Sequence, residues 1–204
     1  MRQIFKTHPW VPPKELPETQ ELFRKYGVPG SIRPGHLLKG KGEPSKLYLI
    51  TRGAAAYYVA DRYKSHPSVL SLLIPGCSAC DLSVITGDRV NVTTRAIGPC
   101  EVLIMQPHVL TDLMKNNSEF AAKEAAHVTR KQECSLEAMV ANFTLEPAER
   151  LRRFLKVLLI NYEVPISESN SAGFDQRTIR SCGQPDSCFS QPNLLRLDQQ
   201  GSLI

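Results

Sequence analysis

The stretch Pro75-Gly76-Cys77-Ser78-Ala79-Cys80-Asp81 decides how this chain is interpreted. It follows an apolar β-like run, Val69 to Ile74, and the Pro-Gly pair predicts a tight turn at the end of that strand. After the turn come two thiols in the spacing Cys77-x-x-Cys80, and then the carboxylate of Asp81. The stretch therefore joins a strand to a loop with candidate site residues, and the surrounding fold determines what that loop can do.

Short β-like runs lie on both sides of this loop. Glycines and prolines separate them, as at Gly53, Pro75-Gly76 and Gly98-Pro99. Many short strands with regularly spaced turn signals favour a barrel or sandwich over alternating strands and helices. The predicted strands are Leu47–Ile50, Ala56–Val59, Val69–Ile74, Asn91–Thr94 and Glu101–Met105.

The first twenty residues are rich in proline. Because proline lacks an N–H group and restricts the residue before it, no continuous helix can form there. We expect residues 1–20 to pack as an extended arm. The prolines are Pro9, Pro12, Pro13 and Pro17.

A helix is predicted from about Pro107 to Asn142, a segment with no further proline or glycine and many strong helix formers. Residues at spacings of three and four place one stripe along it. Its small and apolar residues suit close packing against a second copy of the helix, and the alternative is that the stripe covers the β-domain of its own chain. The stripe comprises Ala121, Ala125, Val128, Gln132, Leu136, Met139 and Phe143.

A second helix is expected to start near Thr144, a suitable N-cap, with Pro147 in its first turn. Its apolar face is predicted to contain Leu151, Phe154, Leu155, Leu158 and Leu159. Four basic residues are predicted on the solvent side, either as a solvated face or as support for nucleic-acid phosphate. They are Arg150, Arg152, Arg153 and Lys156.

The composition is that of an ordinary globular protein. Of the 204 residues 42% are hydrophobic and 22% charged, and the formal net charge of +5 permits nucleic-acid binding without requiring it. The N-terminus lacks the apolar run of a signal peptide, and no run is long enough to span a bilayer. We therefore expect a cytoplasmic protein with no membrane partner, whose six cysteines are reduced thiols, metal ligands or redox sensors rather than a disulfide framework.

In order and spacing, these features resemble the Crp/Fnr family of bacterial transcription regulators. Those proteins combine a cyclic-nucleotide-binding-like β-roll with a long dimerisation helix and a C-terminal helix-turn-helix. The resemblance covers about residues 30–160. The matching segments are Gly35-x-Leu37-Leu38, Gly42, Leu47-Tyr48-Leu49-Ile50-x-x-Gly53, Pro75 to Asp81 and the run from Ala141-Asn142-Phe143 to Glu149-Arg150-Leu151.

Within that resemblance the ligand-binding segment departs from the family pattern P-G-x-x-x-G-E followed by R-[ST]-A. Cys80 replaces the glycine that approaches the cyclic phosphate in the family, and Asp81 replaces the glutamate that binds the ribose hydroxyl. Val90-Asn91 replaces the arginine and the serine or threonine after it. We expect the pocket to bind a small molecule other than a cyclic nucleotide. Alternatively it binds none, or Arg89 substitutes for the missing arginine. The predicted effector-binding residues are Cys80, Asp81, Arg89, Val90, Asn91 and Thr93.

The C-terminal part also departs from the family. Residues 168–192 are rich in serine and glutamine and lack the periodic apolar face of two packed helices. Only the run Gln176-Arg177-Thr178-Ile179-Arg180 resembles a recognition helix, so Gln176, Arg177 and Arg180 are the predicted DNA contacts. The domain is expected to be degenerate or incomplete.

No catalytic motif is present, and we predict no enzyme activity, no cofactor and no metal. Cys77 and Cys80 could take a metal or redox role, with Cys100, His66 or His108 as further ligands. Inert thiols are the other interpretation. A haem held by His127 is a remoter alternative.

The sequence thus predicts an α+β chain in three parts. These are a jelly-roll-like β-domain with its arm (1–106), a dimerisation helix (107–143) and a small winged-helix remnant (144–204). The predicted function is that of an effector-responsive, homodimeric transcription regulator. The alternative is a ligand-binding and dimerisation module that has lost DNA binding.

Overall fold

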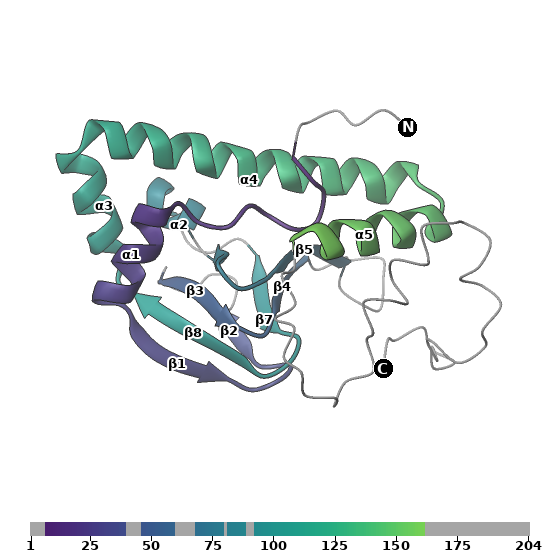
Figure 1. Cartoon of the computed structure of the whole chain (residues 1–204), viewed down its shortest axis with the longest axis horizontal. Coiled ribbons are helices and arrows are strands. Elements are labelled where there is room, and N and C mark those ends of the chain that lie inside the picture. The colour runs from purple at the N-terminus through teal and green to yellow at the C-terminus, as the bar shows by residue number, and fades with distance from the viewer. Residues whose placement is uncertain (1–6, 40–45, 60–67, 80, 89–91, 162–204) are drawn as a thin grey trace. The chain divides into compact units, whose positions relative to one another are not determined.

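A computed structural model describes residues 7–39, 46–59, 68–79, 81–88 and 92–161 (Figure 1). The predicted DNA contacts Gln176, Arg177 and Arg180 lie outside the described residues. The division of the chain into domains at 106 and 143 stays a prediction.

Two four-stranded antiparallel sheets form the β-domain, as the sequence predicts. One sheet has the order β1-β8-β3-β6 and the other the order β2-β7-β4-β5. Apart from β4 and β5, neighbours in each sheet are not consecutive in sequence, which is the pattern of a jelly-roll-like double-stranded β-helix. The strands are β1 (Val28–Ile32), β2 (Leu37–Lys39), β3 (Leu47–Arg52), β4 (Ala55–Val59), β5 (Ser68–Leu73), β6 (Ser78–Ala79), β7 (Thr93–Ala96) and β8 (Cys100–Met105).

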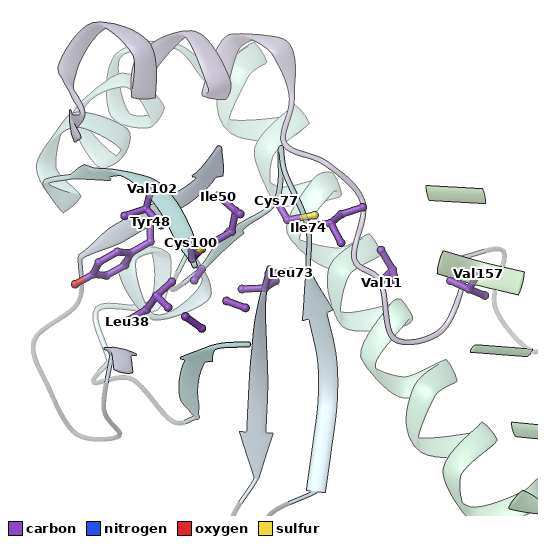
Figure 2. Packing of buried hydrophobic residues seen from close by; sticks show 13 residues of the cluster. Val11, Leu38, Tyr48, Ile50, Leu73, Ile74, Cys77, Cys100, Val102 and Val157 are labelled. Carbon is purple, nitrogen blue, oxygen red and sulfur yellow. The ribbon is translucent and has the colours of Figure 1, made fainter. Parts of the chain in front are cut away.

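The main core lies between these sheets (Figure 2). Side chains of β3 and β8 meet there with those of β5, and Figure 2 shows Ile50, Leu73 and Cys100 among them. Val11 of the N-terminal arm belongs to the same cluster, so the arm is part of the core.

Residues 7–16 run as an extended arm, and the helix α1 (Pro17–Tyr26) begins at the last of the four prolines. The predicted arm is confirmed over residues 7–16 but is wrong over residues 17–20, which are helical, and residues 1–6 lie outside the described residues. Strand β1 was missed because it contains Pro29 and Gly30, which weaken any strand pattern. The proline is tolerated because β1 is an edge strand, which among the described strands pairs only with β8.

The segment from about Pro107 to Asn142 is helical as predicted, but two helices rather than one fill it. Helix α3 (Pro107–Asn116) ends before Asn117, which has an extended φ of −140°, and α4 (Ser118–Thr144) begins after it. The Asn117 side chain accepts a hydrogen bond from the Phe120 N–H at 2.9 Å. Asn117 is thus an N-cap in the middle of a helix-favouring segment.

Helix α4 has an unusual distribution of polarity. Its buried residues include Glu124, His127 and Lys131, whereas Leu136 and Phe143 are exposed. Most of the predicted stripe therefore faces away from its own β-domain, but Val128 is buried within the chain. Helix α4 thus buries charged residues together with apolar ones and leaves a row of apolar residues exposed on its other side.

The predicted faces of the last described helix, α5 (Pro147–Asn161), are wrong in part. Leu151, Leu155 and Leu159 are about half exposed. Arg153 instead turns inward and pairs with Glu137 of α4 at 2.7 Å, and the Arg150 side chain donates to the Asn142 carbonyl. Periodicity finds the apolar rows on a helix but does not tell which of two adjoining rows packs on its own chain.

Among the described residues, no helix is long and apolar enough to cross a membrane.

Candidate functional site

The predicted ligand-binding loop forms a turn, a short strand and a short helix. Gly76 has φ +92°, a left-handed backbone that glycine adopts without strain. Its N–H donates to the Ile50 carbonyl at 2.9 Å, and its carbonyl accepts from the Glu15 N–H at 2.8 Å. The chain continues through β6 into α2 (Asp81–Thr86), so Asp81 is the first residue of that helix.

The Asp81 side chain is buried. Its side chain is 9% exposed, and its Oδ2 lies 2.6 Å from Nζ of Lys131 on α4. The same ammonium group donates to Oγ of Ser78 at 3.2 Å. Asp81 is therefore bound to the long helix. In the family that the chain resembles, the acid at this position binds the ribose hydroxyl.

A second carboxylate completes the surroundings of Lys131. Glu15, at the end of the N-terminal arm, is fully buried, and its Oε1 accepts a hydrogen bond from Lys131 Nζ. That oxygen also accepts from the Ser78 N–H at 3.0 Å. Oε2 of Glu15 lies 3.2 Å from Nε2 of the buried His127. One ammonium group thus joins the arm, the predicted loop and α4; we call Glu15, Ser78, Asp81, His127 and Lys131 the buried charge network.

The network strongly favours the charged forms of Glu15 and Lys131. Burial alone would raise the pKa of Glu15, but the Lys131 charge and the contacts with His127 lower it to about 2. Burial opposes the charge of Lys131 as well, yet Asp81 and Glu15 together raise the pKa of this lysine. A single lysine charge therefore faces two carboxylates in the interior.

Glu124 lies one helical turn before His127 and is also fully buried. Its Oε2 accepts a hydrogen bond from the Thr19 hydroxyl of α1 at 2.8 Å. Burial raises the pKa of Glu124, and the nearby Glu15 charge raises it further. This residue is consequently the carboxyl group of the region best suited to hold a proton.

The structure describes two of the six predicted effector residues. Asp81 is in the network, whereas Thr93 is half-buried in β7, where it pairs with Tyr58 of β4. Cys80, Arg89, Val90 and Asn91 lie outside the described residues. Their role as an effector site stays a prediction.

The described thiols are buried. Burial raises the pKa of Cys77 to about 11 and that of Cys134 to about 12, and Cys100 is also raised, to about 11. A thiol with so high a pKa is a poor nucleophile and a poor metal ligand at neutral pH. Within the described ranges, no group of three His, Cys, Asp or Glu side chains is arranged so that it could hold a metal ion.

Sequence reasoning missed Glu15 and Lys131. The available signal was the polar spacing Glu124, His127, Lys131 inside a helix-forming segment, since three and four residues place side chains on one face. That signal was hidden by the apolar stripe on the other side of α4.

Comparison with known proteins places this geometry in context. Residues 29–117 match the family profile of the cyclic nucleotide-binding domain. FixK2 from Bradyrhizobium japonicum superposes with a TM-score of 0.62 at 18% identity, over 68% of this chain and 69% of that one. The fold is that of the Crp/Fnr regulators. CLP, a c-di-GMP responsive global regulator from Xanthomonas campestris, has the same fold with a TM-score of 0.54 at 19% identity and 75% coverage of both chains. A comparison with curated proteins finds no match.

Within this fold, Lys131 lies on the long helix at the point where the predicted effector loop contacts it. The loop and the long helix of this fold are in direct ionic contact here, through Asp81 and Lys131. Because both groups are buried, no solvent layer separates the loop from α4 at this contact.

Proposed function

We propose that this chain is an effector-responsive transcription regulator that acts as a homodimer. The observation that carries the proposal is the buried contact between Asp81 of the predicted effector loop and Lys131 of α4. An effector can shift a two-state equilibrium only if it binds the two arrangements with different affinity. A loop that is ion-paired to the long helix gives such a difference a physical basis, since moving the loop changes the pairing of buried charges.

The effector is proposed to be a small molecule other than a cyclic nucleotide. In the family that the chain resembles, the residue at position 81 accepts a ribose hydroxyl. Here the Asp81 carboxylate is already bound by Lys131, and a neutral hydroxyl would replace a stronger charge-assisted contact. Cyclic nucleotides are therefore poor candidates for this loop.

DNA binding distinguishes the regulator from a module that has lost it. We expect the full chain to bind duplex DNA at low salt and to lose affinity steeply as salt rises, because bound phosphates exchange with counterions. Fluorescence anisotropy of a labelled duplex between about 50 and 200 mM salt measures this. Addition of cyclic AMP should leave the binding curve unchanged. Absence of binding at the lowest salt would favour the alternative, which the sequence of residues 168–192 supports.

The outer row of α4, Leu136, Met139 and Phe143, supports the homodimer. Their exposed fractions are 48%, 41% and 88%, so the three side chains form an apolar row that their own chain leaves uncovered. A second copy of α4 would bury the row as in a helical pair.

Leu136→Glu should convert the dimer to a monomer, since it places a charge in the proposed interface. Sedimentation equilibrium at a fixed concentration measures the oligomeric state. The matched control is Leu37→Glu on β2, where the leucine is 43% exposed. A wild-type chain that is monomeric, or a Leu136→Glu chain that remains dimeric, would contradict the proposed interface.

A further inference from the structure

The arm from Trp10 to Glu15 contacts both the predicted effector loop and the junction of α4 and α5. At one end, Glu15 binds Lys131 and the Ser78 N–H beside the predicted effector loop. At the other end, Trp10 lies where α4 ends and α5 begins. Figure 1 shows the arm running between α4 and the strands, from α1 toward α5.

Trp10 makes specific contacts at the junction of α4 and α5. Its indole N–H donates to Oδ1 of Asn142 at 3.1 Å. Its ring meets Phe154 of α5 edge-on, with 5.8 Å between centroids and 86° between planes. Ala138 and Ala141 of α4 complete the small cluster around the ring.

The backbone of Trp10 is held in an unfavourable conformation. Its φ is +65°, the left-handed region that bulky residues rarely adopt. The Trp10 carbonyl accepts a hydrogen bond from the Leu72 N–H of β5, and the side-chain contacts fix the ring. Strain of this kind persists only where the surroundings hold it, and such positions are common in switch regions.

The segment between the two ends is stiff. Pro12 and Pro13 fix two φ angles, so rotation at these residues absorbs less of a displacement of Glu15 than it would in a chain without proline. The Pro12 carbonyl also accepts a hydrogen bond from the Cys77 thiol at 3.4 Å, which ties the segment to the predicted loop. Val11 is anchored in the main core.

We propose that the arm 10–15 is a strap that couples the effector loop to the α4–α5 junction: when the Asp81–Lys131–Glu15 contacts change, Trp10 is released from its strained position. The inference rests on the proposed function, because it names the route by which the effector loop acts on the junction. The release of strain at Trp10 favours the second arrangement of the junction and so makes the coupling bistable.

The first test perturbs the loop and observes the junction. Asp81→Asn keeps the shape of the side chain but removes the charge that faces Lys131. Trp10 is the single tryptophan of the chain, so its fluorescence reports on this site alone. We expect a red-shifted emission maximum in the folded variant, because the indole becomes more exposed. Asp112→Asn, on the exposed face of α3, is the matched control and should not shift it.

The second test runs in the opposite direction, since coupling between two sites is reciprocal. Asn142→Ala removes the acceptor of the Trp10 indole at a half-buried position. We expect the Ser78 amide, which donates to Glu15, to exchange its hydrogen about fivefold faster or more. Asn116→Ala, in the last turn of α3, is the control. Unchanged Ser78 exchange in Asn142→Ala, or unchanged Trp10 emission in folded Asp81→Asn, would overturn the strap.

Neither measurement uses DNA or an effector. A chain that shows the coupling but binds no DNA would sink the proposed function and leave the strap in place. A chain that binds DNA with salt dependence but shows no coupling would sink the strap alone.

Discussion

Lys131→Met is expected to lower the free energy of unfolding by about 3–5 kcal/mol, because it leaves two buried carboxylates without their cation. Glu15 and Asp81 both bind this ammonium group, and the side chains of all three residues are less than 10% exposed. Methionine has a similar length and volume, so lost packing contributes little. Urea-induced unfolding at pH 7 and a fixed protein concentration measures the change.

Lys123→Met is the matched control, since it makes the same substitution on the same helix. Lys123 pairs with Glu119 and Glu18, but all three are about half exposed or more, and exposed pairs contribute little. A loss in Lys131→Met no larger than in Lys123→Met would contradict the expectation that Glu15 and Asp81 need the Lys131 charge in the interior.

A triple variant separates the lysine from the unpaired charges. In Glu15→Gln, Asp81→Asn, Lys131→Met the carboxylates are neutral, and much of the lost stability should return. Buried ion pairs are often replaced by neutral groups at little cost, whereas removal of one partner is costly. If the triple variant is as unstable as Lys131→Met alone, the cost comes from packing rather than from charge.

The sequence was sufficient for the strands of the sheet centres. Leu47 to Ile50 and Val102 to Met105 are continuous apolar runs, and they pair within β3 and β8. It was not sufficient for elements whose stability depends on tertiary contacts. Strand β1 contains Pro29 and Gly30, and the break at Asn117 depends on one side-chain cap rather than on proline or glycine.

The site was predictable in part. The turn at Gly76 and the acid at position 81 follow from the local pattern, and the structure places Asp81 at the start of α2. The partners of Asp81 could not be found that way. Lys131 lies 50 residues from Asp81 and 116 residues from Glu15, and each looks like an ordinary surface charge in its own segment. Only the packing of the arm between the loop and α4 buries them together.

A buried network of this kind is a poor device for stability alone, because the desolvation of each ion offsets most of the attraction between them. It does define one arrangement of three segments, since displacing any of them leaves an unpaired charge in the interior. A contact between charges therefore suits a structure with discrete arrangements. A hydrophobic contact is less suited, because apolar surfaces can shift against each other without leaving a charge unpaired. The apolar core around Ile50 supplies stability, whereas the network supplies the specific position of α4 relative to the loop.

Acid is expected to destabilise the buried charge network by protonating Glu15. Its pKa is lowered from 4.5 to about 2 in the folded chain, so the unfolded chain binds the proton more readily. The stabilisation is therefore fully present well above pH 4.5 and is lost as the pH falls through 4.5 toward about 2. At 1.36 kcal/mol for each pKa unit, the total loss is roughly 3 kcal/mol.

Urea unfolding at a series of pH values, with wild type and Glu15→Gln measured at the same concentration, checks this. The stability of the wild type should fall toward that of the variant as the pH drops from about 5, since the variant has no proton to gain at this position. Glu101→Gln, whose carboxylate faces Arg52 on the surface, should follow the wild-type curve closely. Parallel curves for wild type and Glu15→Gln would mean that Glu15 titrates alike in both states and that Lys131 does not hold it charged. Convergence of the two curves would instead identify Glu15 as the carboxylate through which the arm depends on Lys131, because no other acid is altered in that comparison.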